Sequence, residues 1–398
     1  MVKNADINKR GVGNLRGYVF IGNSSKPNES QQKSREDIIL QNVTLIPCSV
    51  ALEMGYKVFV GVNRGNPEGL NCNLPVTLYD SHTYRSLLDI KSNLIAFKNL
   101  KRLIKQNDIE VIHCNSPVGG LVGRICGKIC GVKKIIYTAH GFHFYKGAPL
   151  FNRTIIKLAE KIMARFTDAL IVINNEDFEV SKSFKLKKGG KVYLLNGVGI
   201  SCDEFLNVNA DKSALLKPLG ISENDVVCIS MGDLNDNKNY QTAIKAVAKC
   251  QRLHYLICGV GEREESLKAL CRELDVSDRV HFLGYRSDVK ELLAVSDIFL
   301  LSSFREGLSR SAMEAMASAL PCVVSDIRGN VDLIQNDEGG FVCKATDDSA
   351  FAEALNKLAS DEKLRQRCGK RNLEKVKDYD KDKVKIALQK IYSEVLSS

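Results

Sequence analysis

The feature that most constrains the fold of this chain is a regular alternation of short apolar segments with longer segments of helical spacing. The apolar segments are rich in Val, Ile and Leu and lack alternating polar residues, as a strand buried on both faces requires. Strands separated by helices indicate parallel sheets covered by helices on both faces. The expected strands are Tyr18–Ile21, Lys57–Val62, Val111–His113, Lys134–Thr138, Ala169–Ile173, Val192–Leu195, Val226–Ser230, Tyr255–Cys258, Arg279–Leu283, Ile298–Leu301 and Pro321–Ser325. The expected helices include Leu94–Ile104, Leu150–Phe166, Tyr240–Cys250, Arg263–Leu274 and Asp288–Val295.

A break in this alternation divides the chain into two parts. The turn residues Asn196–Gly199 end one series of strands, and the polar stretch Asp203–Asp211 precedes the next series. We therefore expect an α/β protein with two Rossmann-like, doubly wound domains, residues 1–200 and 201–375. Ligands of such sheets bind beyond the carboxyl ends of the strands, so we expect a site in a cleft between the two domains.

The C-terminal segment has a different character from the rest of the chain. Asp361–Leu396 contains no Pro and one Gly, and its pattern predicts a helix throughout. We expect residues 376–398 to form a C-terminal helix that packs back on the N-terminal domain.

Composition excludes several classes of protein. The 398 residues contain no apolar run near the roughly 18 that a membrane-spanning helix needs. The segment Met1–Arg10 is polar and charged, so we expect no secretory signal and a cytoplasmic location. The 13 cysteines include no C-x-x-C pair, and many lie in apolar runs. We expect reduced, buried thiols rather than disulfides or a zinc site.

Charge is distributed unevenly along the chain. Residues 1–200 contain 29 Lys and Arg against 15 Asp and Glu, whereas the remainder contains 28 against 32. An N-terminal half with this excess of positive charge suits binding to an anionic membrane face, a polyphosphate lipid or a nucleic acid. The same excess is also compatible with charges that are simply scattered over a solvated surface.

The segment with the most chemical information follows the expected strand Ile298–Leu301. Glu306 and Glu314 are separated there by seven residues, and Gly307 permits close approach of the backbone to a ligand. The helix expected to begin at Leu308–Ser309 presents free N–H groups, which favour a diphosphate. Glu314 lies about two turns further and could accept hydrogen bonds from vicinal hydroxyls.

This segment resembles the E-x7-E motif of the retaining GT-B glycosyltransferases of family 4, in particular those of bacterial capsule, exopolysaccharide and lipopolysaccharide synthesis. In that family the first Glu, here Glu306, lies by the transferred sugar, and the second, here Glu314, holds the ribose hydroxyls of the nucleotide. Met231–Asn239 resembles the glycine loop of the family, whose lysine, here Lys238, reaches the donor diphosphate.

Further segments resemble the family in the same order along the chain. Gly259–Glu262 and Val280–Arg286 are similar to its later strand ends, and Tyr137–Phe144 is similar to its donor-side histidine segment. Ile112–Pro117 resembles a preceding segment. The sequence departs from many relatives at Asp233, where they carry Arg, so the diphosphate contact of that loop depends on Lys238.

The resemblance implies a set of site residues. The catalytic residues are expected to be Glu306, His140 and Lys238. The donor-binding residues are expected to be Gly232, Lys238, Gly261, Arg286, Glu306, Gly307, Leu308, Ser309 and Glu314. Residues expected on the acceptor side are Gly22, Asn23 and His113.

The resemblance also implies the reaction and its partners. We expect a hexosyltransferase-type enzyme that moves a sugar, with retention, from a nucleotide diphosphate sugar, most often a UDP-sugar, to a polyprenyl-diphosphate-linked saccharide. No cofactor or metal is expected, because Lys238 and the helix terminus would stabilise the leaving diphosphate. The D-x-D patterns, Asp378–Asp380 and Asp380–Asp382, lie in the expected C-terminal helix. The enzyme would be peripheral on the inner face of the cell membrane, with its basic half toward anionic lipid.

Other functions fit the sequence less well. A nicotinamide dehydrogenase needs G-x-G-x-x-G, of which Gly259–Gly261 gives half. A non-hydrolysing sugar-nucleotide epimerase with the same double-Rossmann plan is a closer alternative. A two-lobed solute-binding protein requires export. A nucleic-acid-binding protein would use aromatic platforms, but aromatic residues make up only 7% of the chain, with no Trp.

Overall fold

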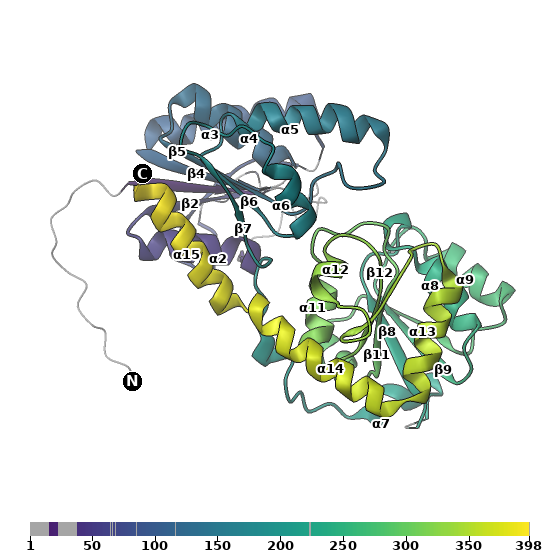
Figure 1. Ribbon diagram of the computed structural model, residues 1–398. Coiled ribbons are helices and arrows are strands. Elements are labelled where there is room, and N and C mark those ends of the chain that lie inside the picture. Colours follow the sequence, from purple (N-terminus) through teal and green to yellow (C-terminus); the bar gives the residue numbers. More distant parts are fainter. Residues whose placement is uncertain are drawn as a thin grey trace, which may run out of the picture.

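Two parallel sheets, one in each half of the chain, organise the computed structural model. The structure describes residues 16–22, 38–63, 65, 67, 69–84, 86–115, 117–222 and 224–397. The N-terminal sheet has seven strands in the order β3-β2-β1-β4-β5-β6-β7, and the ladders between neighbouring strands are parallel (Figure 1). These strands are β1 (Gly17–Ile21), β2 (Lys57–Val62), β3 (Thr77–Asp80), β4 (Ile109–Asn115), β5 (Lys134–Ala139), β6 (Ala169–Val172) and β7 (Lys191–Leu194).

Helices cover both faces of this sheet. One apolar core joins it to α2 (Asn42–Glu53) and to the C-terminal helix α15 (Lys381–Ser397). The other core joins it to α3 (Ile90–Gln106), α4 (Pro117–Cys130) and α5 (Lys157–Ala164), where η1 (Asn152–Ile156) is a π-helical turn that leads into α5. The short helix α6 (Asn175–Ser181) follows β6.

The C-terminal sheet has six strands in the order β10-β9-β8-β11-β12-β13. These are β8 (Val226–Met231), β9 (Leu253–Cys258), β10 (Val280–Gly284), β11 (Ile298–Leu301), β12 (Cys322–Ser325) and β13 (Gly340–Cys343). The α-helices of this domain are α7 (Lys212–Leu216), α8 (Tyr240–Ala248), α9 (Glu264–Glu273), α10 (Val289–Ala294), α11 (Arg310–Ala317), α12 (Asn330–Leu333), α13 (Asp348–Ser360) and α14 (Glu362–Val376). Its short 3-10 turns are η2 (Cys202–Glu204), η3 (Lys217–Leu219), η4 (Asp236–Lys238) and η5 (Lys377–Tyr379). The predicted α/β class with two Rossmann-like sheets is confirmed.

The pattern of apolar residues left two strands unpredicted. Both are edge strands of their sheets, β3 and β13. Neither has a run of buried aliphatic residues, because Thr77–Asp80 is only partly buried and Gly340–Cys343 begins with Gly. An edge strand needs less apolar surface than a central one, so its sequence signal is weaker.

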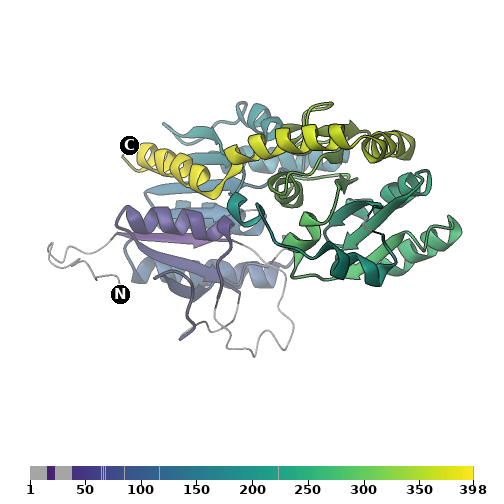
Figure 2. The same cartoon turned by 90° about the horizontal axis from the view of Figure 1, so that it is seen from below.

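The expectation of one continuous helix over Asp361–Leu396 is wrong. The chain forms α14 and α15, separated by η5 and an extended Asp380. The carbonyl of Ile200 accepts from Lys381 N at 2.8 Å, and Ile200 N donates to the carbonyl of Tyr379 at 3.1 Å. The backbone turns here to form an isolated parallel bridge between Asp380 and Ile200, which lies in the segment that links the two domains. Figure 2 shows α14 and α15 running along both lobes, with α15 on the N-terminal domain.

The cysteines pack as apolar side chains. All 13 are unpaired, and 11 of them are buried. Within the described ranges, no helix is long and apolar enough to cross a membrane.

Candidate active site

The two domains meet at a cleft that contains two adjoining cavities. One has a volume of about 350 Å³ and is lined from the N-terminal domain by Asn42 and His140 and from the C-terminal domain by Glu306 and Gly307. The other, of about 370 Å³, is lined by Ser201, Lys290 and Glu314. Asn42 and Arg310 line both cavities.

The segment with the two glutamates follows the carboxyl end of β11, where a loop leads into α11. Ser309 caps this helix, because its hydroxyl accepts from Ala312 N at 3.2 Å. The first N–H groups of a helix have no intrahelical acceptor. The loop therefore presents Glu306 beside a helix terminus that can receive an anion.

Lys238 approaches this loop from the neighbouring strand end. Lys238 is the last residue of η4, a single helical turn that follows β8. Asn235 caps this turn, because its Oδ1 accepts a hydrogen bond from Lys238 N at 3.1 Å. Gly232 has a φ of +150°, and a Cβ there would lie 2.9 Å from the Lys238 Cε. Glycine suits this φ, and any larger residue at 232 would also displace the end of the Lys238 side chain, which reaches Glu306.

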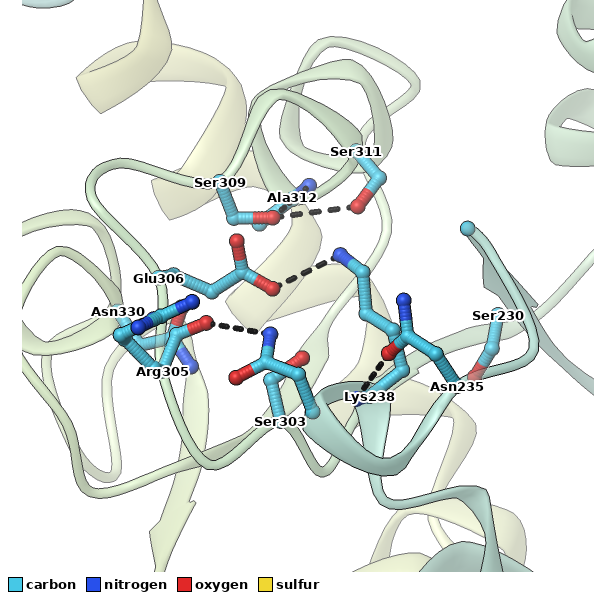
Figure 3. Close-up of polar contacts among 12 residues, drawn as sticks. Ser230, Asn235, Lys238, Ser303, Arg305, Glu306, Ser309, Ser311, Ala312 and Asn330 are labelled. Atoms are coloured by element: carbon cyan, nitrogen blue, oxygen red, sulfur yellow. Dashed lines mark hydrogen bonds and ion pairs between the residues drawn. The ribbon is translucent and has the colours of Figure 1, made fainter. Parts of the chain in front are cut away.

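Lys238 and Glu306 form an ion pair inside the cleft. The Lys238 Nζ lies 2.8 Å from the Glu306 Oε1, and the side chains are only 19% and 15% exposed (Figure 3). The backbones of the two loops are also joined, since Phe304 N donates to the Asn237 carbonyl at 2.8 Å. The Asn237 amide donates in turn to the Arg305 carbonyl at 2.9 Å. This network fixes the ammonium and the carboxylate relative to the start of α11.

Glu314 lies in the second cavity. It pairs with Arg310, one helical turn earlier, whose Nε donates to Oε1 at 2.8 Å. Burial raises the pKa of Glu314, and the cation of Arg310 opposes this shift. Arg310 was not predicted from the sequence, although its place four residues before Glu314 on a helix indicated that the two would be neighbours.

His140 follows β5 and lines the first cavity. Its Nε2 is buried and has no hydrogen-bond partner among the described residues. Burial lowers the pKa of His140 to about 4, so the ring is neutral near pH 7. A buried polar atom without a partner costs stability unless a ligand or water satisfies it, so Nε2 is available to a bound molecule.

His113 has a different environment from His140. Its Nδ1 is 3.0 Å from the Tyr18 hydroxyl and 2.5 Å from the Tyr392 hydroxyl, and its Nε2 is 2.7 Å from the Thr138 hydroxyl. Burial lowers its pKa to about 3. Both ring nitrogens are engaged within the protein, and one of their partners, Tyr392, belongs to α15.

A buried arginine joins the domains beside His140 and Glu306. Arg328 follows β12, and its Nη1 lies 2.6 Å from the Asp177 Oδ1 of the N-terminal domain. Its Nη2 donates to the Phe142 carbonyl, and its Nε donates to the Glu306 carbonyl at 3.2 Å. Sequence reasoning missed Arg328, because its partner is 151 residues away in the chain.

The other expected residues lie around this centre. A Cβ on Gly261 would meet the Leu234 carbonyl oxygen at 2.4 Å, so Gly261 packs against the Lys238 loop. The Arg286 guanidinium pairs with Asp288, with Nε 2.7 Å from Oδ1. The carbonyl of Gly22 accepts from the Thr83 hydroxyl at 2.6 Å. Asn23 lies outside the described residues. Asp233 is exposed.

No group of three His, Cys, Asp or Glu side chains within the described ranges is placed to hold a metal ion. The cleft therefore offers an ammonium, a helix terminus, two carboxylates and a neutral imidazole. These groups can bind a diphosphate and sugar or ribose hydroxyls, and they can stabilise a departing anion.

Comparison with known proteins identifies the family. Residues 211–375 match the family described as glycosyl transferases group 1, and residues 41–174 match the glycosyl transferase 4-like family. The protein EpsD of Bacillus subtilis (strain 168), which its name places among the glycosyltransferases, is 32% identical over 326 residues, 80% of this chain and 84% of EpsD. The chain belongs to the glycosyltransferases. The family expected from the E-x7-E segment is thereby confirmed.

A further relative agrees with this family, and solved structures show the fold. The UDP-Gal:alpha-D-GlcNAc-diphosphoundecaprenol alpha-1,3-galactosyltransferase of Escherichia coli is 29% identical over 283 residues, 69% of this glycosyltransferase and 72% of the relative. The structure of Anabaena HepE in complex with UDP has a TM-score of 0.73 at 16% identity and covers 95% of this chain and 99% of HepE. The structure of the sucrose-phosphate synthase of Thermosynechococcus elongatus has a TM-score of 0.76, also at 16% identity, and the match covers 96% of this chain and 100% of the synthase chain. The expected GT-B fold is confirmed.

Proposed function

We propose that this glycosyltransferase moves a sugar, with retention of the anomeric configuration, from a UDP-sugar to a polyprenyl-diphosphate-linked saccharide during synthesis of a bacterial surface polysaccharide. The observation that carries the proposal is the Lys238–Glu306 pair, 2.8 Å apart, at the start of α11 in the interdomain cleft. The UDP donor is supported by the name of the Escherichia coli relative, and the lipid-linked acceptor by its diphosphoundecaprenol.

The two cavities of the cleft provide a place for each part of the nucleotide donor. The diphosphate would lie at the N–H groups of Gly307–Ser309 and against the Lys238 ammonium, and the ribose hydroxyls would reach Glu314 in the adjoining cavity. Arg310 lines both cavities, so it is placed to supply the second cation that Asp233 cannot supply. The C-terminal domain, residues 201–375, is then the donor domain.

The chemical step is the departure of the nucleoside diphosphate from the anomeric carbon. Negative charge grows on the leaving oxygen as the glycosidic bond breaks, and Lys238 with the helix terminus stabilises it without proton transfer or metal. Glu306 would hold the sugar, and the unpartnered Nε2 of His140 would contact the sugar or the acceptor hydroxyl. The acceptor hydroxyl would attack from the face that the diphosphate leaves, which retains the configuration. Its oxygen forms the new glycosidic bond, and its proton passes to an oxygen of the released diphosphate.

The acceptor would bind to the N-terminal domain, residues 1–200, whose 29 Lys and Arg against 15 Asp and Glu suit a diphosphate lipid in an anionic membrane. The enzyme would therefore work as a peripheral protein on the inner face of the cell membrane.

Thermal stabilisation by a panel of UDP-, GDP- and ADP-sugars tests the donor. A ligand that binds the folded state raises the unfolding midpoint, so UDP-sugars are expected to stabilise the protein most. Transfer to a polyprenyl-diphosphate saccharide, with the anomer assigned by NMR, then tests acceptor and stereochemistry. Conversion of the donor to its epimer without acceptor would instead support the epimerase, and inversion of configuration would contradict retention.

A further inference from the structure

A row of exposed apolar side chains lies on the outer surface of the N-terminal domain. It begins at Leu150 and continues along η1 and α5, where residues at intervals of three to four share one face of the helix. These side chains are 48–73% exposed, whereas large apolar side chains are usually buried. The row consists of Leu150, Phe151, Ile155, Leu158 and Ile162. We refer to it as the α5 row.

The orientation of the α5 row is fixed from the opposite side of the helix. Glu160 points inward and pairs with the buried Arg124 of α4 through two hydrogen bonds, of 2.8 and 3.2 Å. The Arg124 guanidinium also lies 3.9 Å from the centre of the Tyr137 ring. Met163 and Ala164 are buried, and Ala164 belongs to the core that joins the helix to the sheet. The helix cannot rotate the α5 row inward without breaking the buried Arg124–Glu160 pair.

Basic residues accompany the row. Arg153, Lys157, Lys161 and Arg165 recur along the same segment, and Lys146 precedes it. Glu160 is the only acidic residue between positions 146 and 165, and it is paired inward. Among the described residues, no ion pair forms with Arg153, Lys157, Lys161 or Arg165, so the segment combines exposed apolar side chains with an excess of positive charge, the composition of helices that lie in a membrane interface.

Helix α3, which packs against α4 as α5 does, also carries exposed apolar side chains. Leu88, Ile90 and Leu94 lie at or near its first turn and are more than half exposed. Lys91 and Lys98 lie among and after them. Helices α3, α4 and α5 cover the same face of the N-terminal sheet, as Figure 1 shows.

We propose that the α5 row inserts into the surface of an anionic lipid bilayer and orients the enzyme on it. This inference rests on the proposed function, because a lipid-linked acceptor requires the cleft to work at a membrane. The segment Gly141–Pro149 links the α5 row to His140. Leu150 is ten positions after His140, so the start of the row lies at most about 36 Å from the cleft residue.

The charge of the surface favours lipid over a second copy of the chain. Two copies joined through the α5 row would place their lysines and arginines close together, where they repel. An anionic headgroup layer neutralises these cations while its acyl region receives Phe151 and Leu158.

The test is co-sedimentation of the full chain with vesicles of phosphatidylcholine and phosphatidylglycerol, compared with pure phosphatidylcholine. The native chain is expected to bind the anionic vesicles. Replacing Phe151, Ile155 and Leu158 together by Ser is expected to lower the partition coefficient at least about tenfold. The double change Lys157→Gln and Lys161→Gln is expected to lower it roughly 10- to 30-fold at low salt, and less at high salt.

Matched controls use exposed residues away from this surface. Ile386→Ser changes an exposed apolar residue of α15, and Lys363→Gln with Lys370→Gln changes two exposed lysines of α14. These variants are expected to bind vesicles as the native chain does. Unchanged vesicle binding by the Ser variant would overturn the proposal, as would a dimer of the native chain that the Ser variant abolishes. Thermal stabilisation by UDP, measured on each variant, tests the donor site separately, so failure of the proposed function is recognised independently.

Discussion

Arg328 of the C-terminal domain and Asp177 of the N-terminal domain form a buried ion pair across the cleft, with Nη1 2.6 Å from Oδ1. The same guanidinium holds the carbonyl of Glu306 from one domain and that of Phe142 from the other. It thereby fixes the loop that carries Glu306 against the segment that carries His140. The pair is a geometric link between the two halves of the candidate site.

Arg328→Ala is expected to lower kcat about 100-fold. Breaking a buried pair costs about 3 to 5 kcal/mol when the partner stays buried, but here the domains can separate and hydrate Asp177. The cost should therefore appear mainly as a lower population of the closed cleft, which steady-state kinetics with separate kcat and KM would measure. Asn175→Ala is the control, because Asn175 also contacts the opposite domain, at Asp332, but in an exposed position. It should change kcat less than about threefold. Normal turnover by Arg328→Ala would show that the pair does not position the site.

Lys238→Ala is expected to reduce turnover by about 100-fold or more, because it removes the ammonium that would stabilise the leaving diphosphate. Lys249→Ala is the control, since Lys249 forms an ion pair with Asp348 on the same domain, and this pair is more exposed than that of Lys238. Single-turnover transfer assays would separate the chemical step from binding. If both variants turn over alike, Lys238 has no role at the diphosphate.

Much of the fold could be predicted because it depends on local patterns. Central strands such as β6 and β11 are continuous apolar runs, and helix spacing is visible between them. The edge strand β3 could not be predicted in this way, because its residues are only partly buried. The turn at Asp380 also escaped prediction, since it depends on hydrogen bonds to Ile200, which is far away in the sequence.

Part of the candidate site could likewise be predicted from local patterns, and part could not. Glu306 and Lys238 each follow a strand at the carboxyl edge of one sheet, so their proximity could be anticipated from topology. The contact between Arg328 and Asp177 depends on how the two domains dock. No local pattern encodes that arrangement, because an isolated arginine after a strand is as compatible with a solvated turn as with a buried pair.

The buried His113 makes the stability of the protein depend on pH. Its pKa is about 3 in the folded state because of burial, whereas an unfolded histidine titrates near 6.5. Between these values the unfolded state binds the extra proton, so stability falls as pH decreases below about 6.5. This group alone should remove roughly 1.5 kcal/mol of unfolding free energy between pH 6.5 and 5.

Denaturant unfolding of the native protein and of His113→Gln across this pH range would measure the loss of unfolding free energy that His113 causes. The variant should be less stable at pH 8, because it loses contacts to Tyr18 and Tyr392, yet its stability should depend less on pH below 6.5. Parallel pH profiles would contradict this assignment.

Gly307 is expected to tolerate no side chain, because the two domains touch at its backbone. A Cβ at this position would lie 1.8 Å from the carbonyl oxygen of His140, and one on Gly141 would lie 2.9 Å from the Gly307 Cα. Neither neighbour is a flexible side-chain end, so Gly307→Ala can be accommodated only if the cleft opens. Each domain keeps its own core, and unfolding should therefore change little while turnover falls by about 100-fold or more. Small-angle scattering should detect a larger radius of gyration in the variant. A compact variant with normal turnover would show that the close contact between Gly307 and His140 is not needed for the reaction.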